Sequence, residues 1–383
     1  MAMPLVAMAQ QPHFWQVLKS VEEHNPSLRA AATLRDARQQ EAHVGMLIDD
    51  PEVEAAYYWG SPSEIGKRWD LSISQSFDMP SVLLRKARIR DLQENAARLG
   101  YADTRNHLLM ETQMVCADLV YYRAVARLWE ARNTTATGLV SLYGKRFEAG
   151  DCSVLDYNRA QLNQAEVERS AVEAILYVTH TTTQLAILVG DKNYVLAQDE
   201  YEEMDLPGSF PDWYRQFEMS DPELQMLDNQ VTMSSQQAKL SGAEWLPEVS
   251  VGYASENVVG ETFRGVRVGL TLPIWSQPRA VRAAKLNAQA ASQELEARRE
   301  AVYRERECLF HHLYTLRKDI DRLKGAFQRF DSTELLGKAL EQGEIELESY
   351  LQQIDAYYDV RLQILELERQ AEQAWIQLNA PNL

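Results

Sequence analysis

The sequence predicts a mainly α-helical fold with a small β part, built from one structural unit that occurs twice. Three observations predict it: very long stretches with few helix breakers, short stretches in which polar and apolar residues alternate, and a sequence pattern that recurs at a constant shift. The composition agrees, since 17 Gly and 13 Pro in 383 residues favour long helices over many short strands. A chain of this length also exceeds what one hydrophobic core usually serves.

Two pairs of matching segments show the duplication. Asn-Pro-Ser-Leu at residues 25–28 matches Asp-Pro-Glu-Leu at residues 221–224, and Pro-Glu-Val at residues 51–53 recurs at residues 247–249. Both pairs have the same shift of 196 residues, from Pro26 to Pro222 and from Pro51 to Pro247. Two separate matches at one shift are hard to obtain by chance, so we predict two structural repeats.

A strand-like segment follows each Pro-Glu-Val, and a second one follows after a polar turn. Apolar residues occupy every second position, which predicts strands with one apolar and one polar face. Strands of about 8 to 10 residues can cross a bilayer when tilted, and Tyr and Trp at their ends suit a membrane interface. The alternative is an amphipathic hairpin packed on a soluble core. The residues predicted on the membrane strands are Tyr57, Trp59, Trp69, Leu71, Ile73, Phe77, Val249, Val251, Tyr253, Val266, Val268, Leu270 and Leu272.

Long helices fill most of the remaining chain. No proline interrupts residues 81–149, and a helix of that length extends roughly 100 Å, more than any single globular core. Gly150 ends this helix, and a returning helix covers residues 153–189. In the second repeat we expect a helix from Pro278 to Gln342, a break at Gly343, and a returning helix to about Leu378.

The predicted domain organisation follows from these elements. Residues 1–12 form a residual signal or tail, and an acidic linker separates the two repeats. The first repeat covers residues 13–190 with a β-hairpin at 52–77 and a helical tip at Gly150; the linker covers 191–220; the second repeat covers 221–378 with a β-hairpin at 248–273 and a tip at Gly343.

The N-terminus resembles the end of an export signal. Residues 4–9 are apolar, and the small residues Ala7 and Ala9 precede Gln10 as at a cleavage site. The alternative is an ordinary start that happens to be apolar. No cysteine lies nearby to carry a lipid anchor.

Charge and hydropathy exclude several classes of function. With 39 basic and 56 acidic residues the net charge is -17, and the basic residues are interspersed, which disfavours binding to nucleic acid or to an anionic membrane surface. The sequence contains no run of 18 apolar residues, so no transmembrane helix is predicted. A role in a membrane would therefore require β-strands. The three cysteines, Cys116, Cys152 and Cys308, are too few for a disulfide framework.

The four predicted strands require several copies of the chain. Four strands cannot close a barrel, and an open sheet in lipid would leave backbone groups unpaired. Three copies would supply twelve strands, an even number as in bacterial outer-membrane barrels. In the last helix, a narrow apolar seam runs beside an acidic stripe, as in helices packed side by side in one wall, although a merely solvated face is the alternative for the stripe. The seam is Leu347, Leu351, Ile354, Tyr358, Leu362 and Leu365; the stripe is Glu341, Glu344, Glu348, Gln352, Asp355 and Asp359.

From about Phe14 to Leu378, this pattern resembles the TolC family of outer-membrane efflux proteins. The duplicated Asn/Asp-Pro-x-Leu and Pro-Glu-Val segments carry the resemblance, together with Leu-Thr-Leu-Pro-Ile-Trp at residues 270–275. The first tip is similar to that of the family, and the tip at Gly343 resembles the heavy-metal-resistance (CzcC/CusC-like) branch, although Ser349 stands where an Asp is frequent. The residues are Arg146, Phe147, Gly150, Leu155 and Asp156 at the first tip and Leu340, Gly343, Ile345, Leu347 and Tyr350 at the second.

The resemblance implies a homotrimer with a 12-stranded β-barrel in the outer membrane of a Gram-negative bacterium and a 12-helix α-barrel in the periplasm. It would be the passive exit duct of a tripartite efflux pump or type I secretion system, exporting small molecules or metal ions. The partners would be outer-membrane lipid and, at the two tips, a periplasmic adaptor of an inner-membrane pump of the RND or ABC type. The candidate pore or gate residues are Glu344, Glu348, Gln352 and Asp355.

Other functions have weaker support in the sequence. No zinc-protease motif, nucleophile elbow or phosphate loop is present, so we expect neither an enzyme nor a cofactor. Cys308, His311 and His312 could share a helix face and bind a metal, but their apolar neighbours favour a packed helix surface. A periplasmic adaptor with a long helical hairpin is the principal alternative function, and a coiled-coil scaffold is weakened by the four strands.

Overall fold

The computed structural model describes residues 13–44, 50–204, 206, 208–272, 277–330 and 333–380. The predicted signal or tail at residues 1–12 therefore lies outside the described residues, as do Pro207 and the segment from Pro273 to Trp275.

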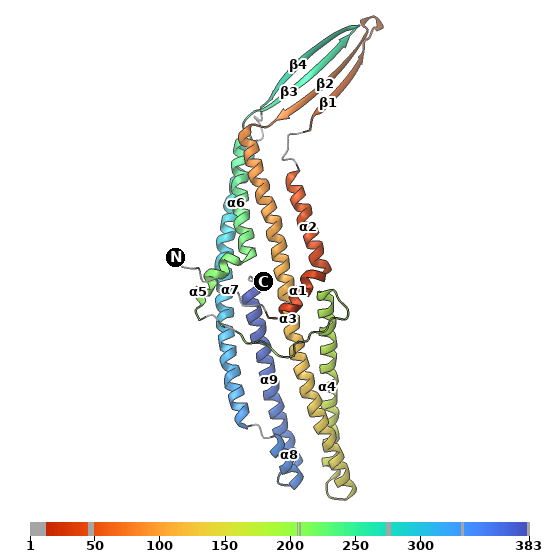
Figure 1. Cartoon of the computed structure of the whole chain (residues 1–383), viewed down its shortest axis with the longest axis vertical. Coiled ribbons are helices and arrows are strands. Elements are labelled where there is room, and N and C mark those ends of the chain that lie inside the picture. The colour runs from red at the N-terminus through yellow and green to blue at the C-terminus, as the bar shows by residue number, and fades with distance from the viewer. Residues whose placement is uncertain are drawn as a thin grey trace, which may run out of the picture. The chain divides into compact units, whose positions relative to one another are not determined.

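The two halves of the chain contain the same elements in the same order (Figure 1). Each has two helices, a β-hairpin, a long helix and a returning helix, and in the second half the short helix α8 lies between the last two. The first half consists of α1 (Trp15–His24), α2 (Pro26–His43), β1 (Glu52–Trp59), β2 (Lys67–Phe77), α3 (Pro80–Glu148) and α4 (Val154–Val189), with a short 3₁₀ turn η1 (Ser63–Ile65) between the strands. The second consists of α5 (Phe210–Ser220), α6 (Pro222–Ala243), β3 (Glu248–Val258), β4 (Glu261–Thr271), α7 (Gln277–Phe330), α8 (Thr333–Gln342) and α9 (Leu347–Asn379). The mainly helical fold with two hairpins is confirmed.

The segment predicted as a linker differs from the expectation. Residues 210–220 form α5, whose place before α6 corresponds to that of α1 before α2. Phe210, Tyr214 and Phe217 are buried and lie three or four residues apart, which is the spacing of one helix face. The acidic residues and prolines before this helix concealed that short apolar pattern.

The helix predicted from Pro278 to Gln342 is two helices. Helix α7 ends at Phe330, and α8 begins at Thr333. Asp331, Ser332 and Thr333 belong to residue types that are more common at helix ends than inside helices.

The chain forms two compact units, and each takes segments from both repeats. Unit 1 contains residues up to Arg29, 104–220 and 303 onwards; unit 2 contains residues 30–103 and 221–302. This division differs from a repeat-by-repeat organisation, because each unit combines matching parts of the two repeats.

Unit 2 contains the sheet. Its four strands are antiparallel in the order β1-β2-β3-β4, and β2 pairs with β3, so the hydrogen bonds of one sheet join the hairpins of both repeats. One row of paired residues runs Val53, Ile73, Tyr253 and Val266. Beside the sheet, Val82 and Ile89 of α3 pack with Leu240 of α6. The amide of Asn229 also donates to the Leu92 carbonyl at 2.9 Å.

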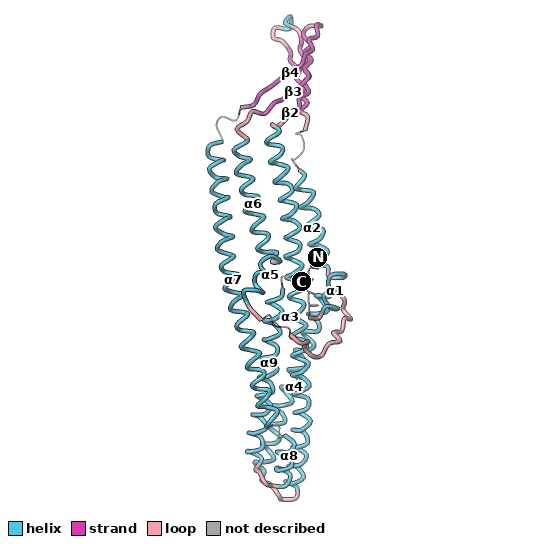
Figure 2. The backbone as a smooth tube through the Cα atoms, turned by 60° about the vertical axis from the view of Figure 1, so that its left-hand side comes forward, coloured by secondary structure: helices cyan, strands magenta, loops and turns pink. Residues whose placement is uncertain are grey.

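Unit 1 is a layer of long helices. In Figures 1 and 2, α4 and α7 lie on opposite sides of this unit, with α3 and α9 between them. Arg369 and Gln373 of α9 both donate to the Asp118 carboxylate of α3, at 2.9 and 2.8 Å. The lower turns of α3, α4, α8 and α9 share one apolar core, described below with the helix tips.

A buried histidine fixes the first described residue of the chain in unit 1. His13 Nδ1 lies 2.6 Å from Glu372 Oε1, and the imidazole stacks on Trp375 of α9 with 3.8 Å between ring centroids. Gln113 of α3 donates to the His13 carbonyl at 2.8 Å. Burial raises the pKa of Glu372, and the hydrogen bond with His13 opposes this rise. The contacts attach the N-terminal segment to α3 and α9.

Two local signals define the ends of α4. Ser153 and Asp156 form a capping box at its start, and Gly190 ends it in the left-handed conformation with φ 78°. A Cβ atom at Gly190 would lie 2.8 Å from the His24 carbonyl oxygen, so both the backbone conformation and the space require glycine.

We therefore expect Gly190→Ala to lower the free energy of unfolding by about 1 to 3 kcal/mol, through backbone strain and the contact with His24. The measurement is denaturant unfolding of detergent-extracted protein followed by circular dichroism. Gly138→Ala is the matched control, because Gly138 lies inside α3 with open space around it; this change should stabilise the chain by about 0.5 to 1 kcal/mol. Equal effects of the two changes would contradict the prediction.

Candidate functional site

The sheet has an apolar face that is exposed to solvent in the single chain. By strand register, the predicted membrane-strand residues of β1 to β4 all share this face, and Leu272 follows β4 directly. Trp59 and Val266 are each 77% exposed, and Val268 is 71% exposed. A contiguous apolar surface of this kind normally faces a membrane or another protein chain.

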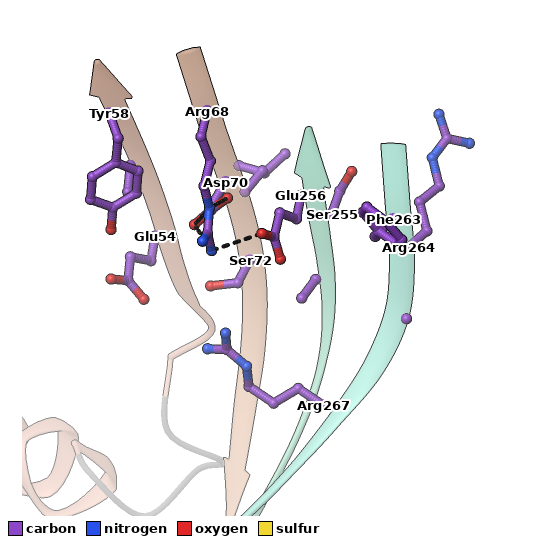
Figure 3. A pocket seen from close by; sticks show the side chains of 14 residues that line it. Glu54, Tyr58, Arg68, Asp70, Ser72, Ser255, Glu256, Phe263, Arg264 and Arg267 are labelled. Carbon is purple, nitrogen blue, oxygen red and sulfur yellow. Dashed lines mark hydrogen bonds and ion pairs between the residues drawn. The ribbon is translucent and has the colours of Figure 1, made fainter. Parts of the chain in front are cut away.

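The opposite face of the sheet is polar (Figure 3). Arg68 of β2 forms ion pairs with Asp70 at 2.8 Å and with Glu256 of β3 at 3.1 Å, and Arg267 extends across the same face from β4. These residues, with Glu54 of β1, line a hollow of about 380 Å³. A sheet with one apolar and one charged face separates lipid from water when it closes.

The sheet has two free edges. Within the described residues, β1 and β4 each pair with one neighbour only, so the backbone groups along their outer sides have no strand partner. Because the number of strands is even, β1 and β4 run in opposite directions. A contact between β4 of one copy and β1 of the next would therefore be antiparallel, like every other pairing in the sheet.

The first helix tip, between α3 and α4, presents apolar side chains. Gly150 has φ 79°, and the amide of Asp151 donates to the Arg146 carbonyl at 2.7 Å, which closes the turn. Leu155 is 74% exposed, and Phe147 is exposed and stacks on Tyr157 at 5.6 Å. The first tip therefore has apolar side chains on its surface.

The tip between α8 and α9 differs from the first tip, because most of its apolar side chains are buried. Leu340, Leu347 and Tyr350, predicted as docking residues, are buried. They belong to one core with Leu139 and Tyr143 of α3, because the two tips pack against each other. Gly343, with φ 75°, stays exposed at the turn, while Ile345 packs at the edge of this core. These three buried side chains hold the two helical hairpins together at their tips.

The predicted acidic stripe is partly neutralised by arginines. Glu348 pairs with Arg159 of α4 at 2.9 Å, and Asp355 pairs with Arg132 of α3. The Arg132 guanidinium also lies over the rings of Trp129 and Tyr358, at 5.0 and 4.9 Å. Sequence reasoning missed both arginines, since they come from other helices. These pairs connect α9 to α3 and to α4, whereas Glu344 and Gln352 are exposed.

Cys308, His311 and His312 are exposed on α7. Among the described residues, no group of three or more His, Cys, Asp or Glu side chains is arranged to hold a metal ion.

Helix α4 is more apolar than the sequence analysis predicted. By length and composition α4 could span a membrane. Only 22% of its most apolar 18-residue window is buried in the single chain. No such helix was expected, because Thr and His residues interrupt the apolar positions. The exposed side chains include Leu162, Ile175, Leu176 and Ile187.

The family model described as outer membrane efflux protein matches residues 213–380, from α5 to the end of α9. The match places this part of the chain among sequences similar to outer membrane efflux proteins. The TolC-type resemblance is confirmed, and the periplasmic-adaptor alternative has no support. None of the curated protein sequences matches the chain significantly.

Solved structures extend the fold comparison to the whole chain. The outer membrane channel CmeC of Campylobacter jejuni is 15% identical with a TM-score of 0.80, and the match covers 96% of this chain and 84% of that channel. The outer membrane protein VceC of Vibrio cholerae is 14% identical with a TM-score of 0.81, at 96% and 95% coverage. CusC is 12% identical with a TM-score of 0.80, at 96% and 91% coverage. The predicted fold class is confirmed, and the similarity to CusC is no greater than to the other two.

The ion pair at Arg132 gives a prediction for the tips. Its side chain is 12% exposed, so Asp355→Asn would leave a largely buried charge without its partner. The unfolding free energy should fall by about 1 to 3 kcal/mol. Glu348→Gln is the control, since both members of that pair are about half exposed, and it should cost about 0 to 1 kcal/mol. The measurement is thermal unfolding of both variants. A larger loss of unfolding free energy in Glu348→Gln than in Asp355→Asn would contradict the prediction.

Proposed function

We propose that three copies of this chain form an exit duct through the outer membrane of a Gram-negative bacterium, with a large helical part in the periplasm. The sheet carries this proposal. Its apolar face is exposed, its other face is charged, and its two edges lack strand partners within the described residues. Three copies supply twelve strands, which satisfies both edges and encloses the charged faces around a water-filled lumen.

The duct is passive, and the chain is not an enzyme. In this arrangement the charged faces of β1 to β4 line the lumen. Arg68 is paired with Asp70 and Glu256, so the wall is hydrated and has no strong excess of either charge. The energy for export comes from a pump in the inner membrane. The cargo is small molecules or metal ions, selected by the pump.

An adaptor protein contacts the helix tips. At the first tip, Phe147 and Leu155 are exposed beside Gly150, and Arg146 and Asp156 flank them. At the second tip, Gly343 lies at the surface, and Glu344 is exposed beside it. We assign docking to this combined surface. The pairs Arg159–Glu348 and Arg132–Asp355 tie α9 to the other hairpin, so opening of the tips would have to break or stretch them.

Oligomeric mass and membrane fraction test the duct. Expression of the full precursor in a Gram-negative host should place the protein in the outer membrane, from which detergent extracts a homotrimer. The physical reason is that only a closed sheet leaves no unpaired edge in lipid. A soluble monomer or dimer in the periplasm would overturn the proposal.

A single substitution tests docking at the first tip. Leu155→Asp should lower the tolerance of the native host to the exported compounds, because it places a charge in an apolar contact while trimers still form. Met219→Asp is the control, since Met219 is 82% exposed at the end of α5 and far in sequence from either tip. Growth at increasing drug or metal concentration is the measurement. Unchanged tolerance of the Leu155→Asp strain would remove the docking role of Leu155.

A further inference from the structure

The two faces of the sheet differ in the sign of the charges they carry. By strand register, every acidic residue of β1 to β4 lies on the polar face, together with Arg68 and Arg267. These acidic residues are Glu52, Glu54, Asp70, Glu248, Glu256 and Glu261. Within the strands, the charged residues of the apolar face are Lys67 of β2 and Arg264 of β4. The apolar face therefore carries positive charge alone, although the chain has a net charge of -17.

The register fixes the face on which each cation lies. Lys67 is opposite Trp59 across the β1–β2 hairpin. Arg264 is opposite Ser255, which is in turn opposite Leu71. Figure 3 shows the Arg264 side chain extending away from the ion pairs of the polar face. Both cations are exposed in the single chain, beside residues that belong to the apolar face.

Both cations lie at the end of the strands where the hairpins turn. A tilted strand crosses a bilayer in about 9 to 11 residues. Counted from Leu272 toward the turn, Arg264 is the ninth residue, and counted from Phe77, Lys67 is the eleventh. The helices follow or precede the opposite ends of the strands. In the proposed duct, the turn end of the sheet is therefore at the headgroups of the outer leaflet.

No carboxylate of the described residues neutralises these two cations. Neither Lys67 nor Arg264 forms an ion pair there, in contrast to Arg68 on the polar face. Glu64 in the β1–β2 turn is exposed and forms no ion pair with them either. Closure of the barrel would bring β1 of the next copy beside β4, and the outer face of β1 has no acidic residue. That face consists of Val53, Ala55, Tyr57 and Trp59.

A hollow at the β1–β2 turn combines one of the cations with apolar side chains. Its volume is about 520 Å³, and Lys67 lines it beside Trp59 and Ile65. Trp59 is 77% exposed and Ile65 is 60% exposed, so the apolar side of the hollow is open. An ammonium group next to exposed apolar surface suits an amphipathic molecule that has an anionic head and an acyl chain.

We propose that Lys67 and Arg264 bind the phosphate groups of lipid A, the phosphorylated lipid of the outer leaflet. This inference rests on the proposed duct, which sets the turn end of the sheet in that leaflet. The guanidinium of Arg264 donates paired N–H groups to a phosphate, and Lys67 supplies a compact charge on a flexible stem. The apolar stems lie along the acyl chains while the charged ends reach the headgroups.

The other end of the apolar face is different. There the strands end at Phe77, Val249 and Leu270, and Leu272 follows β4, so no charged side chain stands at that boundary within the strands. An anionic lipid of the inner leaflet therefore has no cation to bind on this face of the strands. The asymmetry assigns phosphate binding to the outer leaflet.

Native mass spectrometry with lipid A tests the assignment. The full precursor is expressed in a Gram-negative host, extracted from the outer membrane in detergent, freed of lipid and titrated with diphosphoryl lipid A. We expect Arg264→Gln and Lys67→Gln each to lower the affinity about fivefold, the effect of one cation at an anionic lipid surface. The double variant should lower it about 25-fold, since β2 and β4 are not adjacent and the two losses add.

Two controls isolate the contact. Arg267→Gln is the matched position control, because Arg267 lies on the same strand as Arg264 but on the polar face; its affinity for lipid A should equal that of the unaltered protein. Dephosphorylated lipid A is the ligand control, and its binding should be weak and equal in all variants. The mass of each variant in the same spectra shows whether the oligomer is intact.

The outcomes separate this inference from the proposed function. If trimers come from the outer membrane and the double variant binds lipid A as tightly as the unaltered protein, the lipid site is wrong while the duct stands. An equal loss in Arg267→Gln also overturns the site, because the apolar face would not be selective. Displacement of lipid A by inorganic phosphate would assign a site for free phosphate and contradict the lipid. If the protein is absent from the outer membrane, the site and the proposed duct both fail.

Discussion

The pairing of β2 with β3 is the contact on which the rest of the molecule depends. Each repeat alone has a two-stranded hairpin, which is marginal in water. Hydrogen bonds between β2 and β3 merge the two hairpins into one sheet and align their apolar residues in common rows, such as Ile73 beside Tyr253. The same pairing leaves β1 and β4 as outer strands. The chain thereby has a sheet that is ordered internally and incomplete at both edges.

The helices show a comparable relation between the repeats. In unit 1, α9 lies on α3 through Asp118 and through the pair Arg132–Asp355. The tips then share one apolar core, which includes Tyr143 of the first repeat and Leu347 of the second. Because the two hairpins bury each other's apolar residues, only part of each tip remains available to a partner. Exposed Leu155 at the first tip contrasts with buried Leu347 at the second.

Function in this protein depends on surfaces more than on a catalytic centre. The charged face of the sheet, with Arg68, Asp70 and Glu256, suits a hydrated passage, and the apolar face suits lipid. Each of these surfaces is explained by assembly, since each is costly or purposeless on an isolated chain. The match of residues 213–380 to the outer membrane efflux protein family model agrees with this interpretation.

The sequence by itself determined the elements and their order. Alternation with period two marked the strands, Gly150, Gly190 and Gly343 marked helix ends, and the shift of 196 residues revealed the duplication, because all of these are local features of the chain. Local patterns did not reveal α5, since its three buried aromatics form a short signal in an acidic segment. The tertiary structure decided which residues are available. Leu347 and Tyr350 are buried, and Asp355 is neutralised, by side chains about 200 residues away in sequence, Tyr143 and Arg132 among them. Burial and ion pairing depend on which helices become neighbours, and that information lies in the packing of one repeat on the other.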